Sequence, residues 1–229
     1  MKRFVAVLML AGGLLAGNSV MGATVLGTGA ATKFSGATIS SSFWQGFQFT
    51  TGSQSASLNS IDLAIDNAGT TSMTWYLYAD GGLGVPANGA TALATYTAPS
   101  AAYLAYSNGN AATLSSITFG GALASYQLAP NTSYVLILSM STSGLNVAIT
   151  TSPITSTEGW SSNTQRLFTG NSGASWTPSS NPFIFNLNTT SAPAPTAQAV
   201  PSLSEWAQLM LGLMVISMIG WHFHRERSY

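Results

Sequence analysis

The sequence predicts an all-β protein: an antiparallel β-sandwich or jelly-roll domain, followed by one C-terminal transmembrane helix. Short runs in which apolar and polar residues alternate recur through the middle of the chain, and turn-forming residues separate them. No segment there keeps the 3.6-residue period of a helix. Many short strands joined by Gly, Asn and Pro turns are typical of sandwiches. Residues 24–190 are long enough for one such domain.

The expected strands follow one another along this domain with turns between them. In chain order they cover residues 43–51, 58–65, 73–78, 93–97, 117–119, 134–140, 145–149 and 183–187. Groups of Gly, Asn, Asp, Ser and Pro favour chain reversal at residues 67–69, 80–82, 107–110, 120–121, 130–131, 143–144, 171–173 and 181–182. No internal repeat of the kind that builds solenoids or propellers is visible in the sequence.

Charge is scarce in this chain. Only 5% of its 229 residues are charged, with six basic and six acidic side chains, whereas soluble domains carry about a quarter. Ser, Thr and 23 Gly take the place of charge, a profile that suggests an exported β protein. The balanced charge excludes a nucleic-acid partner. The absence of Cys excludes a disulfide scaffold, a thiolate metal site and a Cys nucleophile.

Residues 1–23 have the layout of a signal peptide. A basic start precedes an apolar stretch over residues 4–16, which is too short for a stable membrane anchor. The small residues that follow allow signal peptidase to cut after Gly22, with cleavage after Ala23 as the alternative. We therefore expect export by the Sec machinery and a mature chain that begins near Thr24.

The C-terminal transmembrane helix is expected at about 206–223. The 18 residues from Trp206 to Phe223 include no Asp, Glu, Lys or Arg and would extend about 27 Å, close to the thickness of a bilayer core. Trp206 and Trp221 occupy the places of interfacial aromatics, and Arg225 and Arg227 assign the C-terminus to the cytoplasmic side of the inner membrane. The alternative, a buried core helix, would have no helical partner in a β-rich chain.

A linker and a short motif separate the β domain from this helix. Residues 191–199 are rich in Pro and Ala, which predicts an extended linker. The motif that follows is Val200-Pro201-Ser202-Leu203-Ser204-Glu205-Trp206. Ser202 and Glu205 have the spacing of a capping box, which is sufficient to explain the start of a helix. Short motif, apolar helix and terminal arginines in this order are also typical of a sorting signal.

Residues 200–229 resemble the IPTL-CTERM sorting signal, a relative of the PEP-CTERM signals on which exosortase-type membrane enzymes act in Gram-negative bacteria. That family's pattern is Ile-Pro-Thr-Leu-x-x-Trp-Gly. Three residues match it, and the other three compared positions depart from it: the matches are Pro201, Leu203 and Trp206, and the departures are Val200, Ser202 and Ala207.

The resemblance implies that an exosortase-like membrane enzyme is a partner of this chain. It further implies cleavage near Pro201 to Leu203, followed by transfer or release at the cell envelope. The precursor would then lie in the inner membrane and the product at the cell surface or outside the cell. A permanent single-pass anchor that is never processed is the alternative.

A second, looser resemblance lies in the β domain, over about residues 40–150. A Leu-Tyr-x-Asp-x-x-Gly-x-Pro loop after a strand is similar to the choice-of-anchor R type of extracellular domain. Leu77, Tyr78, Asp80 and Pro86 correspond to it, while the Gly spacing is one residue off. Such domains occur with varied C-terminal anchors, and the resemblance implies no known activity.

The residues offer little for catalysis, and we expect neither an enzyme nor a cofactor. Both histidines, His222 and His224, lie at or beyond the C-terminal end of the expected membrane helix, so the exported part has no histidine for a triad, a dyad or a metal site. Asp62 and Asp66 share one face of an expected strand but would lie about 13 Å apart, too far for a glycosidase pair. We interpret both as solvent-face charges.

Asp80 and Glu158 could form a catalytic carboxylate pair only if the fold brought them together. Their spacing in the sequence does not exclude such a pair. Asp80 could also bind Ca²⁺ through loop carbonyls, although the loop lacks the further acids of an EF-hand, and a turn role is favoured. Trp160 and Trp176 lie in polar, loop-like segments where an exposed ring could stack on a sugar, or they close the ends of the core.

Together these observations predict an exported, non-enzymatic protein of the cell envelope with a structural or adhesive role. The alternative is a surface carbohydrate-binding module whose partner is an extracellular polysaccharide. A third hypothesis is a permanently anchored protein with a Ca²⁺-binding or hydrolytic β domain.

Overall fold

The computed structural model describes residues 22–141, 145–163, 165–191 and 203–226. The chain divides into two compact units, Met1–Ala192 and Pro193–Tyr229. Several expected features lie outside the described residues: the signal peptide up to residue 21, the linker from residue 192, residues 200–202 of the sorting motif, and Arg227.

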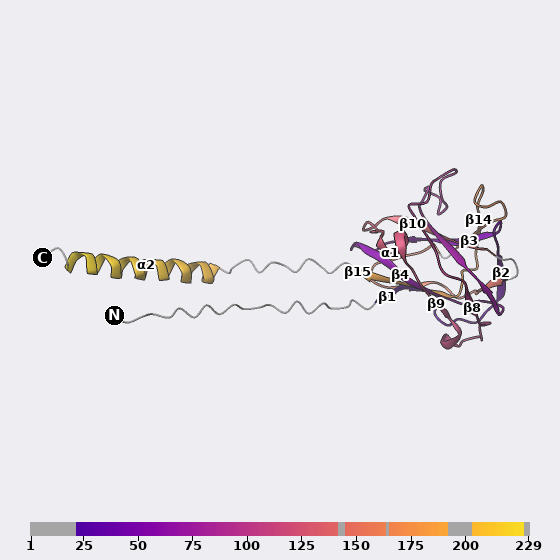
Figure 1. Cartoon of the computed structure of the whole chain (residues 1–229), viewed down its shortest axis with the longest axis horizontal. Helices are drawn as coiled ribbons and strands as arrows, with labels where there is room; N and C mark the ends of the chain where they lie inside the picture. Colours follow the sequence, from indigo (N-terminus) through magenta and orange to yellow (C-terminus); the bar gives the residue numbers. More distant parts are fainter. Residues whose placement is uncertain (1–21, 142–144, 164, 192–202, 227–229) are drawn as a thin grey trace. The chain divides into compact units, whose positions relative to one another are not determined.

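The first unit consists of two main antiparallel sheets, which confirms the predicted all-β class. In spatial order the five-stranded sheet contains β12 (Thr155–Ser156), β1 (Ala23–Gly27), β15 (Phe185–Ser191), β4 (Ala56–Leu63) and β9 (Ser115–Thr118). The six-stranded sheet contains β14 (Thr177–Ser179), β13 (Arg166–Thr169), β3 (Trp44–Thr50), β10 (Ser133–Met140), β6 (Met73–Ala79) and β7 (Ala94–Thr97). In Figure 1, β1, β15, β4 and β9 form the lower side of this unit, and β3 and β10 lie above them.

Two short ladders and two short helices complete the described part of the first unit. One ladder pairs β2 (Ser35–Ile39) with β11 (Leu145–Ile149), and the other pairs β5 (Gly69–Thr71) with β8 (Ala101–Tyr103). The helices are a 3₁₀ turn at Ala111–Thr113 and α1 at Gly121–Ser125.

The main hydrophobic core is formed by side chains that alternate along the strands. In β6, Met73, Trp75 and Leu77 are buried, while the residues between them are only half-buried. The same period of two places Phe47 and Phe49 of β3 inside, because successive strand side chains point to opposite faces. Phe47 packs against Phe185 of β15, with ring centroids 4.5 Å apart, so the core contains residues of both sheets.

Every expected strand is present; β11 has the predicted bounds and the others have shifted ends, but several short strands were not predicted. The unpredicted strands are β1, β2, β5, β8, β12, β13 and β14, which are short or polar. The domain extends one residue beyond its predicted bounds at each end, because β1 begins at Ala23 and β15 ends at Ser191.

One strand end corrects a prediction about two carboxylates. β4 ends at Leu63, and Ile65 only forms an isolated bridge to Val147, so Asp66 does not share a strand with Asp62. Asp62 accepts a hydrogen bond from Asn188 Nδ2 at 3.2 Å within the sheet. Asp66 lies beyond the strand and pairs with Lys33.

The second unit contains α2 (Leu203–Glu226). The helix predicted at about 206–223 lies within it, and α2 begins directly after Ser202, the predicted cap residue. Large apolar side chains of α2 are exposed, including Leu211, Leu213 and Ile216. Within the described part of the chain, no helix reaches both the length and the apolar character that crossing a membrane requires.

Candidate functional site

The candidate site lies on the outer face of the six-stranded sheet, where three half-buried aromatic rings stand on β3 and β6, the two strands that flank β10. Because Trp75 and Leu77 of β6 point into the core, Tyr76 and Tyr78 point outward. In β3, the inward positions of Gln45 and Phe47 likewise leave Trp44 on the outer face.

A small apolar cluster supports these rings. Val135 and Ile137 of β10 and Leu167 of β13 are buried although they belong to the outer face. Ile137 occupies the space that a side chain at Gly46 would need, so Gly46 lets the cluster lie close to the backbone of β3. Partly buried apolar residues pack on it from above, namely Trp44, Tyr76, Tyr78, Val85 and Trp176.

The orientation of Trp44 is fixed from two sides. Its ring stacks on Tyr76, with centroids 5.0 Å apart and planes at 8°. Its Nε1 donates a hydrogen bond to the Ser41 carbonyl at 2.8 Å. Tyr76 in turn lies 6.4 Å from Tyr78, at an interplanar angle of 28°. The three rings therefore form an ordered row across the sheet.

A cleft of about 130 Å³ lies beside this row, and we call it the aromatic cleft. The sheet contributes Trp44 and Tyr78 to it. The remaining lining residues come from two loops: Pro86, Ala87, Gly89 and Ala90 after β6, and Ser172, Gly173 and Trp176 between β13 and β14.

Asp80 shapes the first of these loops. Its Oδ1 accepts hydrogen bonds from the Gly82 and Gly84 amides at 3.0 and 2.9 Å. Gly84 has a φ of 73°, a conformation that glycine adopts without strain. Asp80 also forms an isolated bridge with Pro86. The structure therefore confirms the predicted turn role of Asp80, and that turn carries one wall of the aromatic cleft.

The second loop brings Gly173 between two indole rings. A Cβ on Gly173 would lie 3.3 Å from Trp44 Cζ3 and 3.6 Å from Trp176 Cζ2, and its φ is 90°. Asn171 orders the same loop, because its Oδ1 accepts from the Ser175 amide at 3.0 Å. Another residue here would be strained by the backbone conformation and would also crowd the Trp44 ring.

The polar groups of the aromatic cleft are neutral. Among the described residues, neither the Tyr78 hydroxyl nor the Trp176 indole N–H has a hydrogen-bond partner. Burial, followed by the proximity of Tyr76, raises the pKa of Tyr78, so its hydroxyl keeps its proton at neutral pH. No charged side chain is among the described residues that line the cleft.

The two tryptophans that the sequence offers as ligand contacts, Trp160 and Trp176, differ in burial. Trp160 is only 4% exposed and stacks on Phe49 at 5.6 Å, so the prediction that it could meet a ligand is wrong. Ser161 causes this burial: it pairs with Thr50 at the end of β3 and so brings Trp160 over the core. Trp176 is half-buried in the aromatic cleft. Trp44 and Tyr78 are the cleft residues that sequence reasoning missed.

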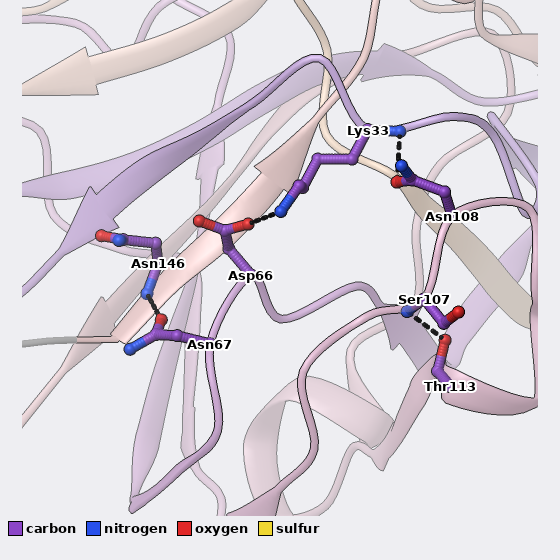
Figure 2. Close-up of polar contacts among 7 residues, drawn as sticks. All are labelled: Lys33, Asp66, Asn67, Ser107, Asn108, Thr113 and Asn146. Atoms are coloured by element: carbon purple, nitrogen blue, oxygen red, sulfur yellow. Dashed lines mark hydrogen bonds and ion pairs between the residues drawn. The ribbon is translucent and has the colours of Figure 1, made fainter.

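A polar cluster beside β2 is the second candidate (Figure 2). Lys33 Nζ lies 2.6 Å from Asp66 Oδ1, and the Lys33 amide donates to Asn108 Oδ1 at 3.0 Å. Nearby, Asn67 Oδ1 accepts from the Asn146 amide at 2.8 Å. These contacts tie the segment before β2 to the loops after β4 and β8. The cluster therefore holds loops together, through one ion pair between side chains and through hydrogen bonds from backbone amides to Asn side chains.

The described residues bring together no group of three or more His, Cys, Asp or Glu side chains that could hold a metal ion. No family model matches the chain, and a search of curated proteins finds no match to it. The geometry of the aromatic cleft is thus the observation from which function is inferred.

Proposed function

We propose that this chain is an exported, non-enzymatic protein of the cell envelope whose β-sandwich has a structural or adhesive role at the surface. The observation that carries the proposal is the ordered aromatic row on the outside of the six-stranded sheet. Rings left half-exposed beside an uncharged cleft favour binding, because the one titratable side chain among the described lining residues is Tyr78, whose raised pKa suits it poorly to proton transfer near neutral pH.

The position of β1 supports removal of a signal peptide. β1 begins at Ala23, and its first residue pairs with Thr189 of β15. Cleavage after Gly22 would therefore leave all of β1 in the mature chain, and cleavage after Ala23 would remove only its first residue. Either product keeps the sandwich whole.

The C-terminal segment supports sorting in a similar way. β15 ends at Ser191, ahead of the proposed cleavage region at residues 201–203, so processing would leave the β domain intact. The sequence supplies the rest of the support: a Pro-x-Leu-x-x-Trp pattern, an apolar segment and terminal arginines. We propose that an exosortase-like enzyme recognises this segment while its apolar part is inserted in the inner membrane.

Intact mass measurement after fractionation of the native envelope tests the sorting proposal. Wild type should yield a species that begins near Thr24 and ends between Pro201 and Leu203, found at the surface or in the medium. The double variant Pro201→Ala, Trp206→Ala should keep its C-terminus and stay in the inner membrane. A matched control, Pro193→Ala with Pro195→Ala in the linker, should be processed normally. A wild-type chain that keeps Tyr229 would contradict sorting and indicate a permanent anchor.

A further inference from the structure

We propose that the aromatic cleft binds an uncharged polysaccharide, with Trp44 and Trp176 against the apolar faces of sugar rings. This inference rests on the proposed function, because a surface location is where such a ligand would be met. It deepens that function by giving the adhesive role a site and a chemical class of partner.

The rings are ordered before any ligand arrives. Trp44 is held by its stack on Tyr76 and by the hydrogen bond from its Nε1 to Ser41. Gly173 lies against Trp44 and Trp176, so this loop keeps a fixed relation to both indoles. Ordered side chains lose little conformational entropy on binding, which favours affinity from a small contact area.

The polar groups of the cleft match a polyol. A pyranose ring offers an apolar C–H face for stacking and hydroxyls around its edge. The Tyr78 hydroxyl and the Trp176 indole N–H have no partner among the described residues and can bond to such hydroxyls. Ser172 adds a second hydroxyl to the lining, and its Oγ donates a hydrogen bond to the Ser41 carbonyl at 3.3 Å. Apolar surface and edge-on polar groups in one cleft are the combination that sugar recognition needs.

The charge and size of the cleft limit further which class of polysaccharide can bind. No Lys or Arg lines it in the described part of the chain, so a uronate or sulfated polymer would lack a counter-charge. Asp80 is the acid in the loop after β6 that forms one wall of the cleft (the wall loop), and its Oδ1 accepts hydrogen bonds from two backbone amides. At about 130 Å³ the cleft is smaller than pockets that enclose a whole ligand. It therefore fits one unit of a chain that continues over the surface.

The direct test is isothermal titration calorimetry of the purified full-length chain, kept in a zwitterionic detergent because sugar-headed detergents would compete. The probes are cellohexaose, laminarihexaose and maltohexaose, with hexagalacturonate as the charged comparison and palmitate as the apolar one. At least one neutral hexasaccharide should bind with a dissociation constant in the millimolar range or tighter. Trp176→Ala should weaken it about tenfold or more, and Trp176→Phe should restore most of the loss.

Two further variants separate binding from folding. Ala90→Gln adds volume at an exposed lining residue without removing a ring, and it should weaken binding about as much as Trp176→Ala. Phe34→Ala removes an aromatic ring that is 64% exposed outside the cleft, and binding should be unchanged. The proposal is overturned if none of the neutral probes binds, if hexagalacturonate or palmitate binds more tightly, or if neither cleft variant changes the affinity. Calorimetry does not depend on processing. A failed sorting experiment would therefore leave the binding result valid, and a failed binding experiment would leave the sorting result valid.

Discussion

Both faces of the six-stranded sheet carry aromatic side chains, but those of the inner face are buried and those of the outer face are half-exposed. On the inner face, Phe47 and Trp75 are 2% exposed and pack between the sheets. On the outer face, Trp44, Tyr76 and Tyr78 come from the same two strands, yet only loops and a small apolar cluster meet them. Inner rings stabilise the fold by leaving water. Outer rings remain half-exposed, so their arrangement is better explained by a binding role than by stability.

The largest expected effect contrasts one ring from each side. Trp75→Ala should lower the free energy of unfolding by about 3–5 kcal/mol, because it opens a cavity in the core. Trp176→Ala should cost only about 1 kcal/mol, because much of its ring already meets water. Urea unfolding followed by circular dichroism measures both. Equal losses would show that the aromatic cleft is an extension of the core.

Glycine substitution sharpens the comparison at the cleft itself. Gly173→Ala and Gly89→Ala both place a side chain at positive φ, which costs about 1–2 kcal/mol. Only the first also crowds an indole, since its Cβ would lie 3.3 Å from Trp44 Cζ3, while Gly89 has nothing within 4 Å. Gly173→Ala should therefore be the more destabilising of the two in urea. Equal unfolding free energies would contradict the close approach of the loop to Trp44.

The wall loop after β6 should respond to a smaller change. Asp80→Ala removes the acceptor of two backbone hydrogen bonds, and we expect a loss of about 1 kcal/mol with faster amide exchange at Gly82 and Gly84. Asp80→Asn keeps a carbonyl acceptor and should recover most of this loss. Hydrogen exchange read by mass spectrometry provides the measurement. If the two variants behave alike, the carboxylate has some other role.

The smallest effect is a pH dependence at the outer face. Burial raises the pKa of Tyr78 above its usual value of 10.0, so the unfolded chain loses this proton first as pH rises. The stabilisation is complete below about pH 10 and is lost as pH rises through the folded-state pKa. Tyr78→Phe should therefore flatten the fall in unfolding free energy above about pH 10. An unchanged slope would contradict the partial burial of the Tyr78 hydroxyl.

The sequence predicted the strands that have one clearly apolar face. Residues 73–78 alternate, residues 134–140 are apolar except at Ser139, and both segments form inner strands of the six-stranded sheet. β2 and β14 have few apolar residues and exist because a partner strand provides their hydrogen bonds. Such strands carry no periodic signal of their own, so the sequence alone could not reveal them.

The aromatic cleft was harder to predict, for a reason that Trp160 and Trp176 illustrate. Both lie in polar segments, yet pairing of Ser161 with Thr50 buries Trp160, whereas the loop before β14 leaves Trp176 half-exposed. Trp44 and Tyr78 are far from Trp176 in the sequence and meet it only through the order of strands in the sheet. The local composition around a tryptophan indicates neither which residues its segment pairs with nor the order of strands in the sheet.

Hydroxyl-radical footprinting of the full-length chain, with and without the best-binding hexasaccharide, tests the contrast between the two faces most directly. Oxidation at each tryptophan is read by mass spectrometry. We expect Trp44 and Trp176 to be oxidised in the free protein and protected by the sugar, while Trp75 and Trp160 stay unreactive in both samples. Oxidation of Trp160, or sugar that leaves Trp44 and Trp176 unprotected, would contradict the assignment of the outer face to binding.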